Sequence, residues 1–187
     1  MSAATLTPRG SFNMNKFFSG RLACGIVAFL LVMTLIACSG KKYNPESDFK
    51  VEPLDGGKSV QITEYVGDKW EVNIPPKIQK LPVTSIGNYA FRNKQLTSVT
   101  IPNGVTEIRS AAFLGNQLTS VTIPDSVTTI IAFAFQNNPL TSITIGSNVS
   151  IASDGRETFS KAFDDFYKEQ GGKAGTYTLN NGEWSVK

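Results

Sequence analysis

One short pattern of apolar and polar residues is written three times between residues 83 and 148. Its strand-like part, Leu96-Thr-Ser-Val-Thr-Ile101, returns at 118–123 and, with one Val replaced by Ile, at 140–145. Each return comes 22 residues after the one before. A fixed period of about 20–50 residues is typical of a solenoid, in which every repeat buries its apolar face against its neighbours. The pattern therefore predicts stacked coils.

Alternation within the coil predicts which side chains face inward. In a strand, successive side chains point to opposite faces, so Leu96, Val99 and Ile101 fall on the inner face. Ser98 and Thr100 then fall on the outer face. The Pro that follows has no amide to donate and ends the strand.

The return half of each coil carries one aromatic ring. Val105-Thr-Glu-Ile108 crosses back on the opposite side, and Ala111-Ala-Phe113 follows in a short helical turn. Stacking places Phe91, Phe113 and Phe135 above one another as a spine. The next turn holds Asn93, Asn116 and Asn137-Asn138. An Asn amide can satisfy backbone groups of a loop, and Asn tolerates left-handed backbone.

The combined motif, Val-Thr-x-Ile-x-x-x-Ala-Phe and then Leu-Thr-x-Val-x-Ile-Pro, resembles the BspA-like class of leucine-rich repeats over residues 60–152. The resemblance implies a β-rich α/β solenoid, a short leucine-rich-repeat array of 22-residue coils. The class occurs in surface proteins of spirochaetes and oral anaerobes. It implies a protein ligand, with host extracellular matrix as one candidate.

Both ends of the array are expected to be capped, because terminal repeats must cover the open stack. Residues 60–82 alternate as a divergent first coil, an N-terminal β cap in which Tyr65 and Trp70 cover the open end or offer a ligand platform. Residues 153–187 are expected to form a helix-plus-hairpin cap. Four aromatic residues at helical spacing predict the helix (Phe159, Phe163, Phe166, Tyr167), and Asn180-Asn-Gly182 is a hairpin turn signal.

The leader resembles that of a bacterial lipoprotein. A basic start and an apolar run end at Leu35-Ile36-Ala37-Cys38, which is similar to a lipobox. The resemblance implies cleavage before Cys38, a lipid on its sulfur and a place in the cell envelope, at the outer membrane or cell surface. Residues 1–37 would be the signal peptide, with Met14 as an alternative start, and 38–59 a polar tether. The alternative is an uncleaved membrane anchor.

Charge and composition exclude several classes of function. The chain carries 18 basic and 15 acidic residues, and three bases precede Cys38, so the remainder is neutral and no nucleic-acid footprint is left. There is no His, and the two Cys lie at 24 and 38. Nucleophile pairs with His and zinc spacing are therefore absent, and the sequence also contains no phosphate-binding glycine loop. We expect no enzyme, cofactor, metal or small-molecule substrate, and interpret Asp154, Glu157, Asp164 and Asp165 as a solvated face.

The repeated outer hydroxyls are the candidate binding surface. They form two columns (Ser98, Ser120, Ser142 and Thr100, Thr122, Thr144), spaced by the separation of about 4.8 Å between strands. They indicate a flat, uncharged protein-contact face, or simply β-propensity and solubility, or a lattice for ice or glycan. The leading hypothesis is a non-enzymatic, lipid-anchored envelope protein that binds proteins, possibly a host adhesin; the alternative is a periplasmic or envelope scaffold without a host ligand.

Overall fold

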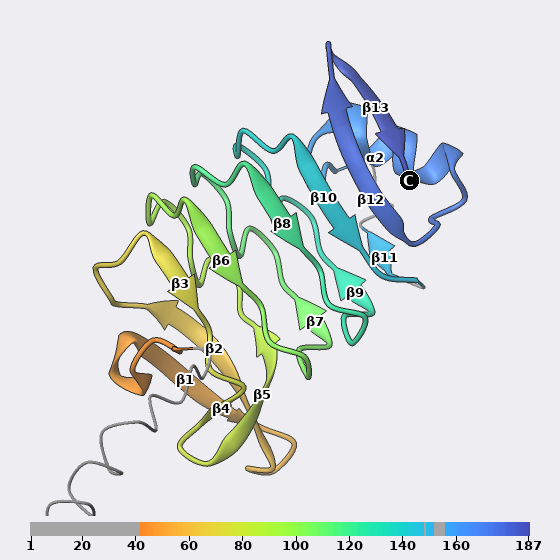
Figure 1. Ribbon diagram of the computed structural model, residues 1–187. Helices are drawn as coiled ribbons and strands as arrows, with labels where there is room; N and C mark the ends of the chain where they lie inside the picture. Colours follow the sequence, from red (N-terminus) through yellow and green to blue (C-terminus); the bar gives the residue numbers. More distant parts are fainter. Residues whose placement is uncertain (1–41, 148, 152–155) are drawn as a thin grey trace, which may run out of the picture. The chain divides into compact units, whose positions relative to one another are not determined.

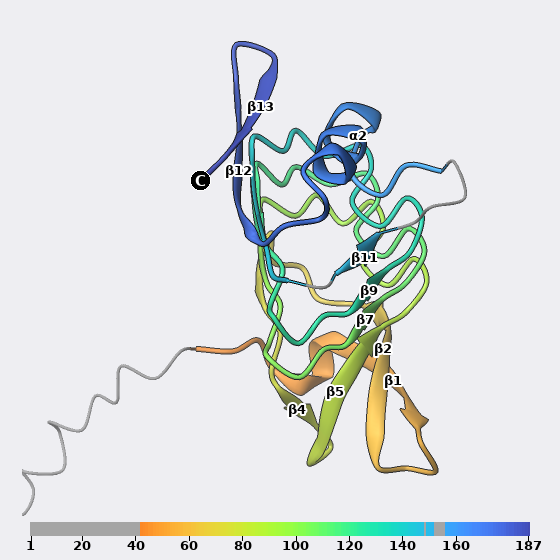
Figure 2. The same ribbon diagram turned by 90° about the vertical axis from the view of Figure 1, so that its right-hand side faces the viewer.

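A computed structural model describes residues 42–147, 149–151 and 156–187, which wind into stacked coils (Figure 1). Two sets of strands lie on opposite sides of the stack (Figure 2). The first sheet runs in the order β1 (Phe49–Leu54), β2 (Ser59–Tyr65), β5 (Leu81–Ile86), β7 (Glu107–Ile108), β9 (Thr129–Ile130), β11 (Ser150–Ile151), with β4 (Lys77–Ile78) beside β5. The opposite side carries β3 (Glu71–Asn73), β6 (Ser98–Thr100), β8 (Ser120–Thr122), β10 (Ser142–Ile145), β12 (Gly175–Asn180) and β13 (Glu183–Val186).

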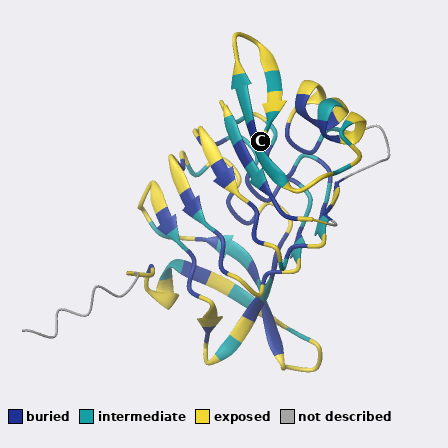
Figure 3. Cartoon of the chain, turned by 45° about the vertical axis from the view of Figure 1, so that its right-hand side comes forward, coloured by how far each residue is buried: buried dark blue, intermediate teal, exposed yellow. Residues whose placement is uncertain are grey.

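The 22-residue period appears directly in the strand register. Parallel pairing sets Val121 against Ile143 and Ile108 against Ile130. The inward positions of the coils are buried, whereas the outer faces and turns are largely exposed or half-buried (Figure 3). The predicted fold class, a β-rich α/β leucine-rich-repeat solenoid, is confirmed.

A column of stacked rings forms the centre of the core. Phe91 and Phe113 stack with ring centroids 4.9 Å apart, and Phe113 and Phe135 with centroids 5.0 Å apart. The column is longer than the three predicted rings, because Tyr65 stacks on Phe91 at one end and Phe159 on Phe135 at the other, at 5.4 and 5.0 Å. All five rings are buried.

Phe159 therefore belongs to the repeats. Its predicted place in the C-terminal helix is wrong, and so is the predicted end of the repeats at residue 152. Phe159 precedes the helix, α2 (Lys161–Glu169), whose N-cap Ser160 accepts a hydrogen bond from the Phe163 amide. The repeat also extends past the predicted boundary at 152, since the Phe159 ring fills the spine position of a further coil. The step from Phe135 to Phe159 is 24 residues instead of 22 (159 − 135), so Phe159 does not fit the 22-residue period of the sequence.

The predicted helical turn around Phe113 is also wrong. Residues 110–115 form consecutive turns, and Ala111 has a left-handed φ of 55° that a helix does not accept. The amides instead bond to the neighbouring coil: the Phe91 amide donates to Ala112 O and the Phe113 amide to Ala134 O, both at 2.7 Å. These rungs tie the coils together beside the ring column.

The tether predicted at 38–59 is wrong from Asn44 onward. The Asn44 amide donates to Asn73 O at 2.9 Å, η1 (Glu46–Asp48) follows, and β1 then pairs antiparallel with β2. Phe49 is buried, with its ring 5.6 Å from that of Tyr65. The N-terminal cap thus begins before residue 60, because Phe49 and Val51 supply the apolar positions that close the stack.

The C-terminal hairpin forms as predicted. β12 and β13 pair across Asn181 and Gly182, whose φ angles of 51° and 86° are those of a type I′ turn. β12 also adds antiparallel to β10, so the hairpin continues the sheet of the coils. Tyr177 is buried and meets the edge of Phe163 at 5.4 Å, which joins the hairpin to α2.

Candidate binding surface

The six hydroxyl residues singled out from the sequence lie on one face, on three adjacent strands. Pairing of β8 with β10 sets Ser120 against Ser142 and Thr122 against Thr144, and β6 carries Ser98 and Thr100 at the equivalent positions. The residues between them, Val99, Val121 and Ile143, are buried. Ser98, Ser120 and Thr122 are exposed, and the other three are half-buried.

The hydroxyls on β6 and β8 have no partner within the described part of the chain. No side-chain hydrogen bond connects any of the four to another described residue, nor does one for Ser142. On β10, Thr144 Oγ1 lies 3.0 Å from Thr176 Oγ1. Most of the predicted face therefore keeps its hydrogen-bonding capacity for a ligand or water.

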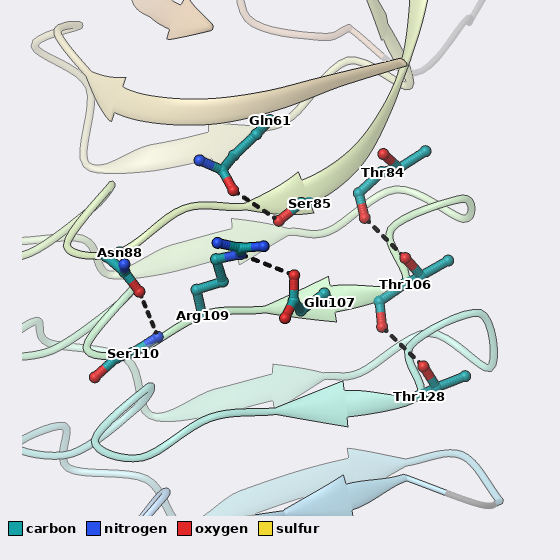
Figure 4. Close-up of polar contacts among 9 residues, drawn as sticks. All are labelled: Gln61, Thr84, Ser85, Asn88, Thr106, Glu107, Arg109, Ser110 and Thr128. Carbon is teal, nitrogen blue, oxygen red and sulfur yellow. Dashed lines mark hydrogen bonds and ion pairs between the residues drawn. The ribbon is translucent and has the colours of Figure 1, made fainter. Parts of the chain in front are cut away.

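The threonines of the opposite sheet differ in this respect (Figure 4). Thr106 Oγ1 donates to Thr84 O at 3.1 Å, and Thr128 Oγ1 donates to Thr106 O at 3.2 Å. Ser85 donates to Gln61 at 3.2 Å, and the Arg109 guanidinium bonds Glu107 at 2.8 Å. The Thr and Ser hydroxyls hold neighbouring coils together, whereas the Arg109–Glu107 pair lies within one coil. The two faces therefore have similar composition but differ in how many hydroxyls are left for a ligand.

The outward positions of β6, β8 and β10, here called the open face, continue onto strands beyond the six predicted residues. Thr176 and Thr178 on β12 lie opposite Thr144 and Ser142 and continue the two columns. At the other end, Asn73 pairs with Thr100 in register and Glu71 with Ser98. Glu71 is the one charged residue at the outward positions of β3, β6, β8, β10 and β12. The sequence signal for this extension is Thr176-Tyr177-Thr178. Two hydroxyl residues flank a buried residue there, as in Ser98-Val99-Thr100.

The acidic residues interpreted from the sequence as a solvated face do not form one, and they do not form a carboxylate pair either. Asp165 is exposed and pairs with Lys161 at 2.7 Å, whereas Glu157 accepts a hydrogen bond from the Gln136 amide at 2.9 Å. Asp164 is buried and accepts hydrogen bonds from the Thr158 and Phe159 amides. It therefore fixes the segment that carries the last ring of the spine. Asp154 lies outside the described residues.

Burial makes Asp164 a source of pH-dependent stability. Desolvation raises the pKa of Asp164 from 3.8 to about 6, against the opposing effect of the two amides and Lys168. Between these values the folded protein retains a proton that the unfolded chain releases, so stability falls as pH rises through that window. We expect this group to lower the free energy of unfolding by about 2–3 kcal/mol between pH 4 and 7.

Urea unfolding between pH 4 and 7 tests this expectation, with Asp164→Asn removing the slope. Asp165→Asn is the matched control. The ion pair with Lys161 lowers the pKa of Asp165, so its stabilisation is lost only as pH falls below about 4 and adds no slope in the window. Parallel pH profiles for wild type and Asp164→Asn would contradict the assignment.

A cavity lies beside the C-terminal hairpin, away from the hydroxyl columns. It has a volume of about 390 Å³ and is lined by Pro139, Leu140, Phe159, Leu179 and Trp184, among others. The described residues that line it are mainly apolar and include no ionisable side chain. Tyr65 and Trp70, predicted to cover the open end or to offer a ligand platform, lie in different environments. Tyr65 is buried in the spine, whereas Trp70 is 64% exposed.

The lipobox residues Leu35, Ile36, Ala37 and Cys38 lie outside the described residues. Among those that are described, no helix is long and apolar enough to cross a membrane. The same part of the chain holds no group of three His, Cys, Asp or Glu side chains placed to bind a metal ion.

Stacked 22-residue coils, a strand of the form Leu-x-x-Val-x-Ile in each, and a ring column between two sheets define a leucine-rich-repeat solenoid. Residues 83–164 match the BspA type leucine rich repeat region in six copies. This region of the chain belongs to that family. The comparison with curated protein sequences gave no match.

Three solved structures resemble the chain. A leucine-rich repeat protein from Bacteroides ovatus is 26% identical, with a TM-score of 0.44 over 57% of this chain and 36% of its own length. This chain thus spans about a third of that protein. The Treponema pallidum leucine rich repeat protein is 18% identical (TM-score 0.35, 70% and 96% of the two chains). A leucine rich cell surface protein from Faecalibacterium prausnitzii is 21% identical (TM-score 0.36, 80% and 62%).

Proposed function

We propose that this chain is a non-enzymatic, lipid-anchored protein of the bacterial cell envelope that binds a protein ligand through the outer face of β3, β6, β8, β10 and β12. The observation that carries the proposal is the contrast between the two sheets. On one sheet, Thr84, Thr106 and Thr128 are joined coil to coil, whereas the hydroxyls on β6 and β8 of the other remain free within the described residues.

A rigid array of donors and acceptors suits protein recognition. Each hydroxyl both donates and accepts, and its position is fixed by a buried neighbour on the same strand, so little order has to be imposed on binding. The face is nearly uncharged, which favours contact through shape and hydrogen bonds over electrostatic steering. A ligand of the host matrix would make the protein an adhesin, and one inside the envelope would make it a scaffold.

The combined substitution Thr100→Lys and Thr122→Lys tests this surface. Two long charged side chains would project from the centre of the face, and we expect at least a tenfold loss of affinity, about 1.4 kcal/mol, for a ligand that covers it. Thr144 is left intact because its hydroxyl bonds Thr176. Binding is measured with the full chain against immobilised matrix proteins and against proteins cross-linked to it in its own envelope.

The matched control is Thr106→Lys with Thr128→Lys, which places the same charges on exposed positions of the opposite sheet. This control should retain ligand binding, after allowance for any loss of stability measured by thermal unfolding. Equal loss in both pairs, or none in the Thr100/Thr122 pair, would move the binding surface elsewhere.

The anchor is tested separately, by Cys38→Ser. We expect the unsubstituted protein to fractionate with membranes through lipid on the Cys38 sulfur, and Cys38→Ser to remain unprocessed and unlipidated. Mass spectrometry of the amino-terminal peptide reads the acyl groups directly. An unmodified Cys38 peptide from membrane-bound protein would instead support an uncleaved anchor.

If the lipid is present, the repeats lie close to the bilayer. The described residues begin at Lys42, whose carbonyl oxygen accepts a hydrogen bond from the Asn73 side chain, and Lys42 follows Cys38 by four positions (42 − 38). Four residues span at most about 14 Å when fully extended. The proposed tether would therefore be short.

Protease accessibility on intact cells distinguishes the two roles. Cleavage of the repeat region on intact cells would place the open face outside and support an adhesin. Protection until the outer membrane is opened would support the scaffold, and the ligand would then be sought among periplasmic proteins.

A further inference from the structure

β13 is an edge strand of the four-stranded sheet and differs from the edge strands β3 and β1 at the other end of the solenoid. β3 is covered, because Asn44 and Lys42 bond to Asn73. β1 carries Pro53, which has no amide, and a bulge at Lys50/Val51, two devices that prevent edge-to-edge pairing. β13 has neither Pro nor bulge, and no other described segment hydrogen-bonds to its outer side.

The register of the hairpin identifies which backbone groups face this edge. Thr176 and Lys187 exchange both of their hydrogen bonds, at 3.4 and 3.2 Å. Because antiparallel pairs alternate, Ser185 and Glu183 also direct their backbone groups toward β12. The N–H and C=O groups of Trp184 and Val186 therefore point to the open edge.

The sequence of this strand is complementary to itself when run in the opposite direction. In an antiparallel pair centred on Ser185, Glu183 of one copy faces Lys187 of the other, and Trp184 faces Val186. Opposite charges and aromatic–β-branched pairs are both favourable across strands. Trp184 and Val186 then form the hydrogen-bonded pairs. Glu183 and Lys187 occupy the other kind of pair, in which side chains come closest.

Glu183 and Lys187 are also available for such a contact. Both are exposed, and neither has a side-chain hydrogen bond or ion pair with another described residue. We propose that β13 is an interaction surface for a second copy of this chain, forming a two-fold symmetric dimer by antiparallel pairing of the two β13 strands about Ser185.

The dimer would join two four-stranded sheets (β13-β12-β10-β8) into one. Ser185 lies on the same face as Thr178, to which its hydroxyl bonds. The open hydroxyl face would therefore run continuously from one copy into the next. An edge of four residues gives a weak dimer in solution, and confinement on a membrane raises the effective concentration of such a pair. The pairing itself does not depend on the proposed ligand or anchor.

Charge reversal provides the test. Full-length chain, extracted from membranes in mild detergent, is followed by sedimentation over a wide range of concentration. We expect the wild type to show a monomer–dimer equilibrium. Glu183→Lys creates two like-charge contacts in the dimer, as does Lys187→Glu, and each alone should raise the dissociation constant about tenfold.

An equimolar mixture of the two single variants should restore association, because a heterodimer places opposite charges at both contacts. Thermal unfolding checks that each variant is folded, as expected for substitutions at exposed positions. A wild type that stays monomeric, single variants that dimerise as the wild type does, or a mixture that fails to recover would each overturn the proposal.

Disulfide trapping tests the register independently. Facing residues at a pair without hydrogen bonds have Cα atoms about 4.5 Å apart, within the range a disulfide spans. Ser185→Cys should therefore give a covalent dimer on mild oxidation, with peptide mapping to separate it from Cys24 and Cys38 chemistry. Ser120→Cys, exposed on the same face away from the edge, should not. Equal cross-linking of both variants would reject the register.

Discussion

Phe113→Ala is expected to cost about 3–5 kcal/mol of folding free energy, a large share of the 5–15 kcal/mol that holds a typical domain together. Phe113 is fully buried, and its ring stacks at 4.9 Å on Phe91 and at 5.0 Å on Phe135. Removing the ring leaves a cavity in the middle of the column and ends both stacking contacts. A solenoid is stabilised by contacts between neighbouring coils, so this gap separates the two halves of the stack.

The measurement is urea unfolding of the full chain, followed by circular dichroism. Phe133→Ala is the matched control, because this Phe lies twenty residues along the chain (133 − 113), outside the ring column, and is only half-buried. We expect it to cost clearly less. Phe113→Leu retains most of the volume and should fall between them. An unfolding midpoint for Phe113→Ala equal to that of the wild type would show that the ring column does not contribute to the stability of the fold.

Much of this fold follows from the sequence because the repeat reports the same environment several times. Val99, Val121 and Ile143 recur at one spacing, so their inward direction could be assigned from alternation alone. The failures lie where the repeat stops being regular. Phe159 comes two residues late, and Phe49 precedes the first coil among polar residues and a Pro. Both rings are identified by what they stack on, which is a property of the closed stack.

The candidate surface was only partly predictable for a related reason. Ser and Thr recur on both sides of each coil, and the sequence is equally consistent with either face being open. Which hydroxyls are used internally depends on whether a carbonyl of the adjacent coil lies within reach, as Thr84 O does for Thr106. Asp164 was misjudged in the same way, because its partners are two amides that become neighbours only when the last coil closes.

Asn116→Ala is the other substitution expected to have a large effect, about 3–5 kcal/mol. Asn116 is 5% exposed and makes four hydrogen bonds, three to the preceding coil and one within its own. Its Oδ1 accepts from the Lys94 and Leu96 amides at 3.1 and 3.0 Å, and its Nδ2 donates to Phe91 O and Phe113 O at 2.8 Å each. Alanine removes this partner from the Lys94 and Leu96 amides and from Phe91 O, whereas Phe113 O still accepts a hydrogen bond from Asn138 Nδ2 at 2.9 Å. Each buried group without a partner costs about 1–3 kcal/mol.

Asn116→Asp separates the hydrogen bonds from the shape of the side chain. Aspartate retains an oxygen that can accept from both the Lys94 and Leu96 amides, but it directs its other oxygen at the carbonyls of Phe91 and Phe113. At neutral pH we therefore expect it to be at least as destabilising as alanine. Burial beside two carbonyls raises the pKa of a carboxyl group. Stability should therefore recover as pH falls and the proton restores one donor. Gln117→Ala, at an exposed amide side chain next along the chain, is the control and should change stability by less than about 1 kcal/mol. If Asn116→Ala is as mild as that control, or if Asn116→Asp shows no gain on acidification, the Asn116 amide is not what joins these coils.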